Sequence, residues 1–182
     1  MGDTLAPDPW TAHHRSVVVD QGCPGCGLVL APPERDMGAA AGASPACWAV
    51  QPGVAGFEAE HPAVLRSHQL LVDAYGAQHA APGSIRLPYS LVGLQLTLDH
   101  GWTGEAVRLL HSRMGKPRPD WPAFERPEHV GTRTVLDVAE AGARSGSERG
   151  HTAALHDWAT DVWRAWSAHH AAVSALAARF VR

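Results

Sequence analysis

The most constraining feature of the sequence is the segment QGCPGCGLVL, residues 21–30, in which a proline and a glycine separate Cys23 from Cys26. A Cys-X-X-Cys pair can be half of a metal site, a redox-active dithiol, or a turn that happens to contain thiols. The runs SVVVD (16–20) and LVLA (28–31) on either side favour β-strands. The segment therefore predicts a small β-hairpin with both thiols at its tip.

The surroundings of the two cysteines favour a metal over redox chemistry. A redox pair is typically found at a helix N-terminus after a strand in a βαβ unit, and no such pattern follows here. The proline and glycines of CPGCG let the backbone fold tightly, so that both sulfurs point inward and accept hydrogen bonds from backbone N–H groups. We interpret the pair as half of a zinc (Zn2+) knuckle, with the redox pair and the ordinary turn as alternatives.

Length and composition limit the class of protein. A chain of 182 residues can bury a core without disulfides, and three cysteines cannot all pair within it. The 15 basic and 18 acidic residues nearly balance and form no basic cluster, which argues against nucleic acid as the main partner. No apolar run is long enough to span a membrane, and the first residues lack the pattern of a signal peptide. We expect a cytoplasmic protein that binds no membrane.

The organisation predicted from the sequence is mainly α. Residues 1–15 are polar and proline-rich and predict a flexible arm. Residues 16–182 predict a single domain, a helical bundle with the small N-terminal zinc-knuckle β-hairpin (16–31) docked against it. No internal repeat is apparent, which excludes a solenoid.

Local signals place the helices. Ser44 is a good N-cap, and Pro52 and Gly53 predict that the helix it begins ends after about two turns. Apolar spacing predicts a long helix over 62–79, whereas 90–101 fits either a strand or a buried helix. Further helices are expected at 103–114, 134–142 and 151–181, and the four prolines within 116–131 predict an extended strap that lays Trp121 over an apolar surface.

The remaining ligands of a zinc ion must come from distant segments. Cys47 is the only other cysteine and lies in the first turn of a predicted helix, where the helix dipole favours a thiolate; the alternative is a small buried apolar residue. The fourth ligand would be one of twelve histidines. His169 lies on the tryptophan-rich face of the C-terminal helix if that helix is continuous, and we predict it as the ligand. If Ser167 begins a new helix, His170 becomes an alternative.

Three further side chains are candidates for catalysis. His68 and His79 share one face of the predicted helix, but they lie roughly 16 Å apart along its axis and cannot bind one ion together. With Tyr75 they would line a cleft under the Trp121 strap, where histidine can act as a general acid or base. The alternative for His68 is a neutral imidazole hydrogen-bonded within the core.

Two functions follow from these candidates. The first is a zinc-binding, non-redox metalloenzyme that acts on a small-molecule substrate in bacterial metabolism. The second is a helical binding or interaction protein whose zinc is structural and which catalyses no reaction. Three protein ligands and a water would favour the enzyme, and four protein ligands would favour the structural site. Signatures of nucleotide chemistry, including the Walker A loop and GxGxxG, are absent.

Five short motifs occur in order along the chain: CPGCG (23–27), SPACW (44–48), VDAYGAQH (72–79), LVGLQLTLDHG (91–101) and VWRAWSAHH (162–170). In this combination they resemble a family of small bacterial, largely actinobacterial, proteins of unknown function, over roughly residues 20–175. The resemblance implies a mostly helical fold, which favours a helix over 90–100, and it implies no activity. The Leu-rich segment of that family begins with histidine, where this chain has Ser90.

Overall fold

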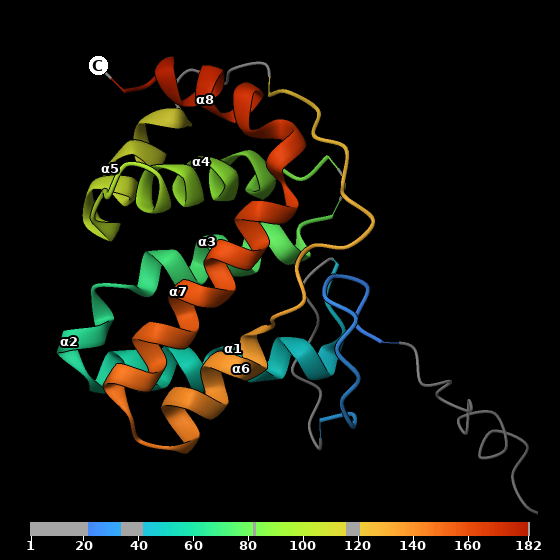
Figure 1. The fold of residues 1–182 in the computed structure, drawn as a ribbon, viewed down its shortest axis with the longest axis vertical. Helices are drawn as coiled ribbons and strands as arrows, with labels where there is room; N and C mark the ends of the chain where they lie inside the picture. Colours follow the sequence, from blue (N-terminus) through green and yellow to red (C-terminus); the bar gives the residue numbers. More distant parts are fainter. Residues whose placement is uncertain (1–21, 34–41, 82, 116–120, 182) are drawn as a thin grey trace, which may run out of the picture.

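The computed structural model describes residues 22–33, 42–81, 83–115 and 121–181, and this part of the chain is mainly helical (Figure 1). The helices are α1 (Pro45–Glu60), α2 (Pro62–Leu65), α3 (His68–His79), α4 (Arg86–Leu98), α5 (Gly104–Met114), α6 (Val135–Ala139), α7 (Glu148–Ala165) and α8 (His170–Ala178). A π-helical turn, Glu140–Arg144, follows α6, and a 3-10 turn, Ser167–His169, separates α7 from α8. Among the helices described, none combines the length and apolar character needed to cross a bilayer.

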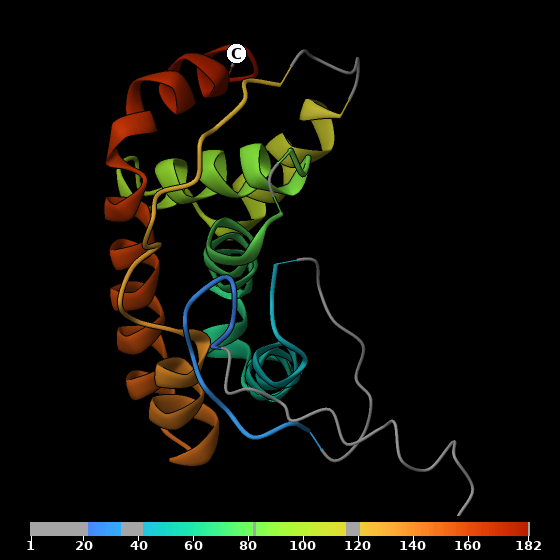
Figure 2. The ribbon, with the colours of Figure 1, turned by 90° about the vertical axis from the view of Figure 1, so that its right-hand side faces the viewer.

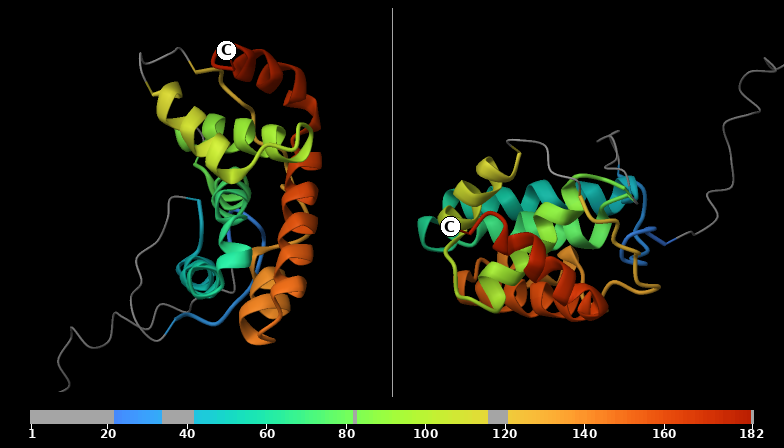
Figure 3. Two further views of the ribbon diagram at one scale, coloured as in Figure 1. Left: turned by 90° about the vertical axis from the view of Figure 1, so that its left-hand side faces the viewer. Right: turned by 90° about the horizontal axis from the view of Figure 1, so that it is seen from above.

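The helices stack along the long axis of the molecule. In Figure 1, α8 lies at one end, α4 and α5 come next, α3 lies near the middle, and α1, α2 and α6 form the other end. Figures 2 and 3 show α7 running along one side of this stack, where it contacts α3, α4 and α6. The core is continuous through the layers, and the largest apolar side chains buried in it include Leu71, Leu91, Leu94, Trp158 and Trp166.

The predicted hairpin is not seen. The arm (1–15) and the first predicted strand (16–20) lie outside the described residues. Residues 24–26 form a turn, and residues 22–33 contain no strand. The apolar run at 28–31 is therefore irregular chain.

Helix α1 is twice as long as predicted, because Pro52 does not end it. The helix runs through Pro52 to Glu60, and Val54, Phe57 and Glu58 in its second half are buried. A proline inside a helix removes one hydrogen bond and disturbs the preceding turn. Burial of this second apolar face outweighs that local penalty, so tertiary packing overrides the signal to stop.

The helix predicted over 62–79 is interrupted. It divides into α2 and α3 at Arg66 and Ser67, where the Ser67 hydroxyl donates to the Val64 carbonyl at 2.5 Å. Within α3, Leu71, Ala74 and other residues are buried, whereas Val72 is 41% exposed.

Several other predictions are confirmed. Residues 90–98 are helical, as part of α4, and α5 begins at the predicted N-cap, where the Thr103 hydroxyl accepts from the Ala106 N–H at 3.3 Å. The C-terminal segment is helical but breaks near Trp166, the alternative that Ser167 suggested. Residues 121–131 contain no helix, and the Trp121 ring packs against the ring of Tyr89 with centroids 5.2 Å apart.

One buried amide fastens the strap to the bundle. The Gln78 side chain is fully buried; its Nε2 donates to the carbonyls of Val130 and Arg133 at 2.8 and 2.9 Å. Its Oε1 accepts from the indole N–H of Trp158 at 3.1 Å. Gln78 therefore holds the extended segment against α3 and α7 at the end of α3 that carries His79.

Candidate metal centre

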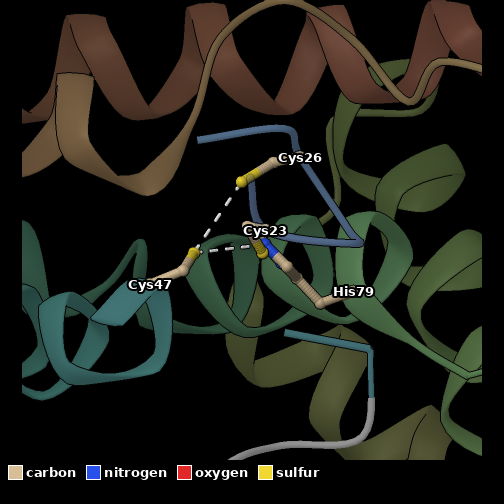
Figure 4. Close-up of side chains that lie close together, drawn as sticks. All are labelled: Cys23, Cys26, Cys47 and His79. Carbon is tan, nitrogen blue, oxygen red and sulfur yellow. Dashed lines mark hydrogen bonds between the residues drawn. The ribbon is translucent and has the colours of Figure 1, made fainter. Parts of the chain in front are cut away.

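The CPGCG turn presents two thiols to the bundle. The Cys23 N–H donates to the Leu28 carbonyl at 2.9 Å, and the Gly27 N–H donates to the Cys23 carbonyl at 2.7 Å. Gly27 has a φ of +74°, which a residue with a side chain rarely adopts. This closed turn places Cys23 and Cys26 on the same side of the chain, as the knuckle interpretation requires (Figure 4).

The start of α1 supplies the third thiol. The Ser44 hydroxyl caps the helix by accepting from the Cys47 N–H at 3.2 Å, which fixes Cys47 in the first turn. The Ser44 N–H in turn donates to the Cys23 sulfur at 3.3 Å. One residue thus positions Cys47 and contacts the turn across the site.

The end of α3 supplies an imidazole. The Nδ1–H of His79 donates to the Tyr75 carbonyl at 3.0 Å, which leaves Nε2 free as a ligand, and Nε2 lies 3.4 Å from the Cys47 sulfur. Metal-binding histidines usually orient the ring in this way, through the second nitrogen. A Cβ on Gly25 would lie 2.3 Å from Cδ2 of His79, so the close approach of turn and imidazole requires glycine there.

The four side chains have the spacing of a tetrahedral metal site. Their ligand atoms all lie within 4.8 Å of one another, and the sulfurs of Cys26 and Cys47 are 3.8 Å apart. Around zinc, with Zn–S of about 2.3 Å, sulfurs lie about 3.8 Å apart, and sulfur and nitrogen about 3.5 Å apart. All three cysteines are free thiols, and Cys23, Cys47 and His79 are almost fully buried. This Cys3His cluster could hold a metal ion.

Hydrogen bonds among the three thiols shift their pKa values in opposite directions. Hydrogen bonds from the thiols of Cys26 and Cys47 hold the pKa of Cys23 far below its ordinary value. The same interactions raise the pKa of Cys26 to about 11 and that of Cys47 further, where burial adds to the effect. A metal that binds all three sulfurs displaces the protons that the thiols carry.

A cation lies beside the cluster. The Arg126 guanidinium donates to the carbonyl of Gly25 in the turn at 2.6 Å and to the carbonyl of Gln78, next to His79, at 2.7 Å. Burial lowers the pKa of Arg126, and negative charge on Cys23 and Cys26 opposes this effect. Arg126 thus links two of the three segments that form the cluster and supplies a positive charge near its sulfurs.

The fourth residue of the cluster is His79, where the sequence predicted His169. The chain turns into the 3-10 segment after Trp166, and His169 Nε2 donates instead to the Glu125 carbonyl at 2.7 Å. The alternative, His170, stacks on the Trp163 ring and its Nε2 donates to the Trp163 carbonyl at 3.0 Å. Both histidines therefore anchor local structure around α7 and α8.

The three predicted catalytic residues do not share one cleft. His79 belongs to the Cys3His cluster, and Tyr75 stacks on it with ring centroids 4.1 Å apart. The Tyr75 hydroxyl points to the Cys47 sulfur at 3.9 Å, and burial, followed by the charge of Cys47, raises the pKa of Tyr75. Tyr75 therefore supports the cluster.

His68 lies apart from both, at the other end of α3. Its Nδ1–H donates to Glu58 Oε2 at 2.7 Å, while the buried His151 donates from Nε2 to Glu58 Oε1 at 2.9 Å. Glu58 is fully buried, and the His68 side chain is 43% exposed. His68 thus forms a hydrogen bond within the protein, which was the alternative to a catalytic role for it.

Two residues at the metal centre have no direct signal in the sequence. The sequence predicts His79 as a residue that lines a cleft, and its place at the C-terminus of a helix is the available signal for the metal centre. Arg126 lies among the prolines of the strap, where no periodic pattern marks a buried cation.

The four residues of the metal centre lie within a region that matches a protein family. Neither the curated proteins nor the solved structures yielded a significant match. A family profile matches residues 21–167, which include all four residues of the cluster and most of the helical bundle. The chain belongs to DUF5946, a family of unknown function.

Proposed function

We propose that the chain is a zinc-binding protein whose Cys3His site is structural and fastens the N-terminal turn to the helical bundle. The observation that carries this proposal is the convergence of four protein ligands from three separate segments at tetrahedral spacing. Four protein ligands fill the coordination positions of structural zinc, whereas catalytic zinc keeps one position for water. The structural reading is thus favoured over the metalloenzyme.

The ligand chemistry supports zinc in particular. Three thiolates with one imidazole form a soft donor set that suits zinc, and Cys3His is one of its common structural combinations. Zinc with three thiolates and a neutral imidazole carries a net charge of −1. The Arg126 guanidinium hydrogen-bonded at the edge of the site offsets this charge.

Metal content tests the proposal directly. Protein purified without added metal is expected to contain one zinc per chain by elemental analysis, and His79→Ala or Cys47→Ala is expected to lose most of it, because three ligands bind more weakly than four. His169→Ala is the matched control and is expected to retain zinc fully, since its imidazole contacts the Glu125 carbonyl. Wild-type protein that binds no zinc, or equal loss in His79→Ala and His169→Ala, would contradict the proposal.

Arg126 is expected to tune the affinity for zinc. Arg126→Ala removes both hydrogen bonds to the ligand-bearing segments and the charge beside the thiolates, so zinc should bind about 10- to 100-fold more weakly. Arg126→Lys keeps the charge and should recover part of the loss. Competition with a chromophoric chelator measures the affinity. Arg133→Ala, which removes an exposed arginine paired with Asp157 at 3.7 Å, is the control; if it has the same effect as Arg126→Ala, this role of Arg126 is wrong.

A further inference from the structure

A cavity of about 470 Å3 lies between α1, α3, α4 and α5, next to the metal centre. Three aromatic side chains, Trp48, Tyr75 and Tyr89, line it. Trp48 follows Cys47 in the chain and packs edge to face on Tyr75, with ring centroids 5.8 Å apart. Because Tyr75 also contacts the Cys47 sulfur, part of the cavity wall is built on the metal centre.

The same cavity is lined by a buried acid. Asp73 is only 2% exposed; its Oδ1 accepts from the Gln69 amide at 3.0 Å, and its Oδ2 has no hydrogen-bond partner among the described residues. A Cβ on Gly93 would lie 2.0 Å from Oδ2, so a glycine in α4 makes room for the carboxyl. Burial raises the pKa of Asp73 well above its ordinary value. Burial without a counter-charge favours the neutral acid, and a cation bound beside Asp73 would favour its carboxylate form.

A second unpaired atom belongs to His111, another residue that lines the cavity. His111 is hydrogen-bonded to the backbone of Tyr89, and its Nε2 is buried without a partner in the described structure. In the tautomer that carries its proton on Nδ1, the unpartnered Nε2 presents a lone pair. Burial lowers the pKa of His111 to about 4, which keeps the ring neutral near pH 7. Asp73 in its carboxylate form and His111 in this tautomer thus both accept hydrogen bonds.

We propose that this cavity binds a small organic ammonium ion, a protonated amine, with the Asp73 carboxylate as its counter-charge and the aromatic rings of Trp48, Tyr75 and Tyr89 around it. Aromatic faces attract cations, and an ammonium group supplies the N–H donors that the two unpaired acceptors lack. The site goes beyond the proposed zinc function and does not require the ion to take part in binding.

The charges around the cavity favour a cation over an anion. Arg86 also lines the cavity, but it is exposed and forms no ion pair with Asp73 in the described structure, so its charge stays solvated. A carboxylate ligand would bring a second negative charge close to Asp73, which is unfavourable in a partly buried site. An uncharged alcohol would leave the acid without a counter-charge.

Binding of charge-matched probes tests this proposal. The probes are n-butylamine and benzylamine, which are cations near pH 7, with n-butanol, benzyl alcohol, butyrate and benzoate as neutral and anionic counterparts. Dissociation constants come from saturation-transfer NMR and from intrinsic tryptophan fluorescence, with zinc-loaded protein. We expect an amine to bind at least about tenfold more tightly than its alcohol, and the carboxylates to bind most weakly. Amines that do not bind, or that bind no better than the alcohols, overturn the proposal.

Substitutions locate the binding. Asp73→Asn keeps the shape of the side chain and should weaken amine binding about tenfold or more, and Tyr89→Leu should weaken it severalfold by removing an aromatic face. Glu105→Gln alters an exposed carboxylate that lines two other cavities and should leave binding unchanged. Zinc content and circular dichroism are measured for each variant, so loss of amine binding with full zinc content distinguishes this site from the metal centre. Unchanged amine affinity in Asp73→Asn contradicts the proposal.

Discussion

Removing zinc is expected to lower the free energy of unfolding by several kcal/mol. A ligand that binds only the folded state stabilises it by about 4 kcal/mol when its free concentration is a thousand times the dissociation constant. The Cys3His site gains its ligands from three segments that lie far apart in the unfolded chain, so binding and folding are coupled. Thermal unfolding followed by far-UV circular dichroism, over a series of buffered free zinc concentrations, should show the melting temperature rise with zinc.

The same thermal unfolding series in two variants tests whether the rise in melting temperature comes from zinc at the Cys3His site. Cys47→Ala should melt near the temperature of metal-free wild type at every zinc concentration, because an essential ligand is missing. His169→Ala should respond to zinc as wild type does, whatever its own stability. A wild-type melting temperature that is independent of zinc would mean that the ion does not stabilise the fold.

The loss of stability when zinc is removed should be greatest near the CPGCG turn (23–27). Residues 22–33 contain no helix or strand, and they contact the bundle through the sulfurs and through the Arg126 hydrogen bond to Gly25. Helix α1 depends on the site at its first turn, where the Ser44 cap also contacts Cys23. Hydrogen exchange should therefore rise first in these segments when zinc is withdrawn, and later in the buried core of α3 and α7.

The sequence predicts helices best where local chemistry determines them. The caps at Ser44 and Thr103 are local, since each side chain satisfies an N–H three residues further on, and both helix starts are confirmed. Helix ends were harder to predict. Pro52 is a strong local signal to stop, yet the face of α1 that carries Val54 and Phe57 packs into the core and sustains the helix. A short stretch of sequence does not reveal which distant segments will pack against it.

The metal centre, too, has residues that the sequence predicts and one that it does not. Three cysteines in the chain leave few choices, so chemistry alone predicts that Cys23, Cys26 and Cys47 act together. Twelve histidines leave many choices, and only the three-dimensional arrangement selects His79. The break of the C-terminal helix at Trp166 turns His169 toward the strap, a change in direction that the regular tryptophan spacing concealed.

Buried polar groups hold the helices in register at the other end of α3. Glu58 of α1 accepts hydrogen bonds from His68 of α3 and His151 of α7, so one carboxyl joins three helices. A Cβ on Gly142 would lie 2.8 Å from Nδ1 of His151, which shows how closely the π-helical turn packs on this ring. A buried acid with two partners specifies one arrangement of these helices, since any shift leaves polar atoms unpaired.

Glu58→Ala is accordingly expected to lower the free energy of unfolding by about 3–5 kcal/mol, because it leaves the buried imidazole of His151 without an acceptor. Glu58→Gln keeps an oxygen for one histidine and should cost about 1–3 kcal/mol. Urea unfolding at a fixed free zinc concentration measures both, and zinc content should remain at the wild-type level, which separates this effect from metal loss.

Double-mutant cycles measure the coupling energy of Glu58 with each of its two histidine partners. His151 is fully buried and His68 is 43% side-chain exposed, so the coupling of Glu58 to His151 should exceed its coupling to His68. Glu60→Ala, at an exposed position near the end of the same helix, is the matched control and should change stability by no more than about 0.5 kcal/mol. If Glu58→Ala is no more destabilising than Glu60→Ala, the buried carboxyl does not hold α1, α3 and α7 together.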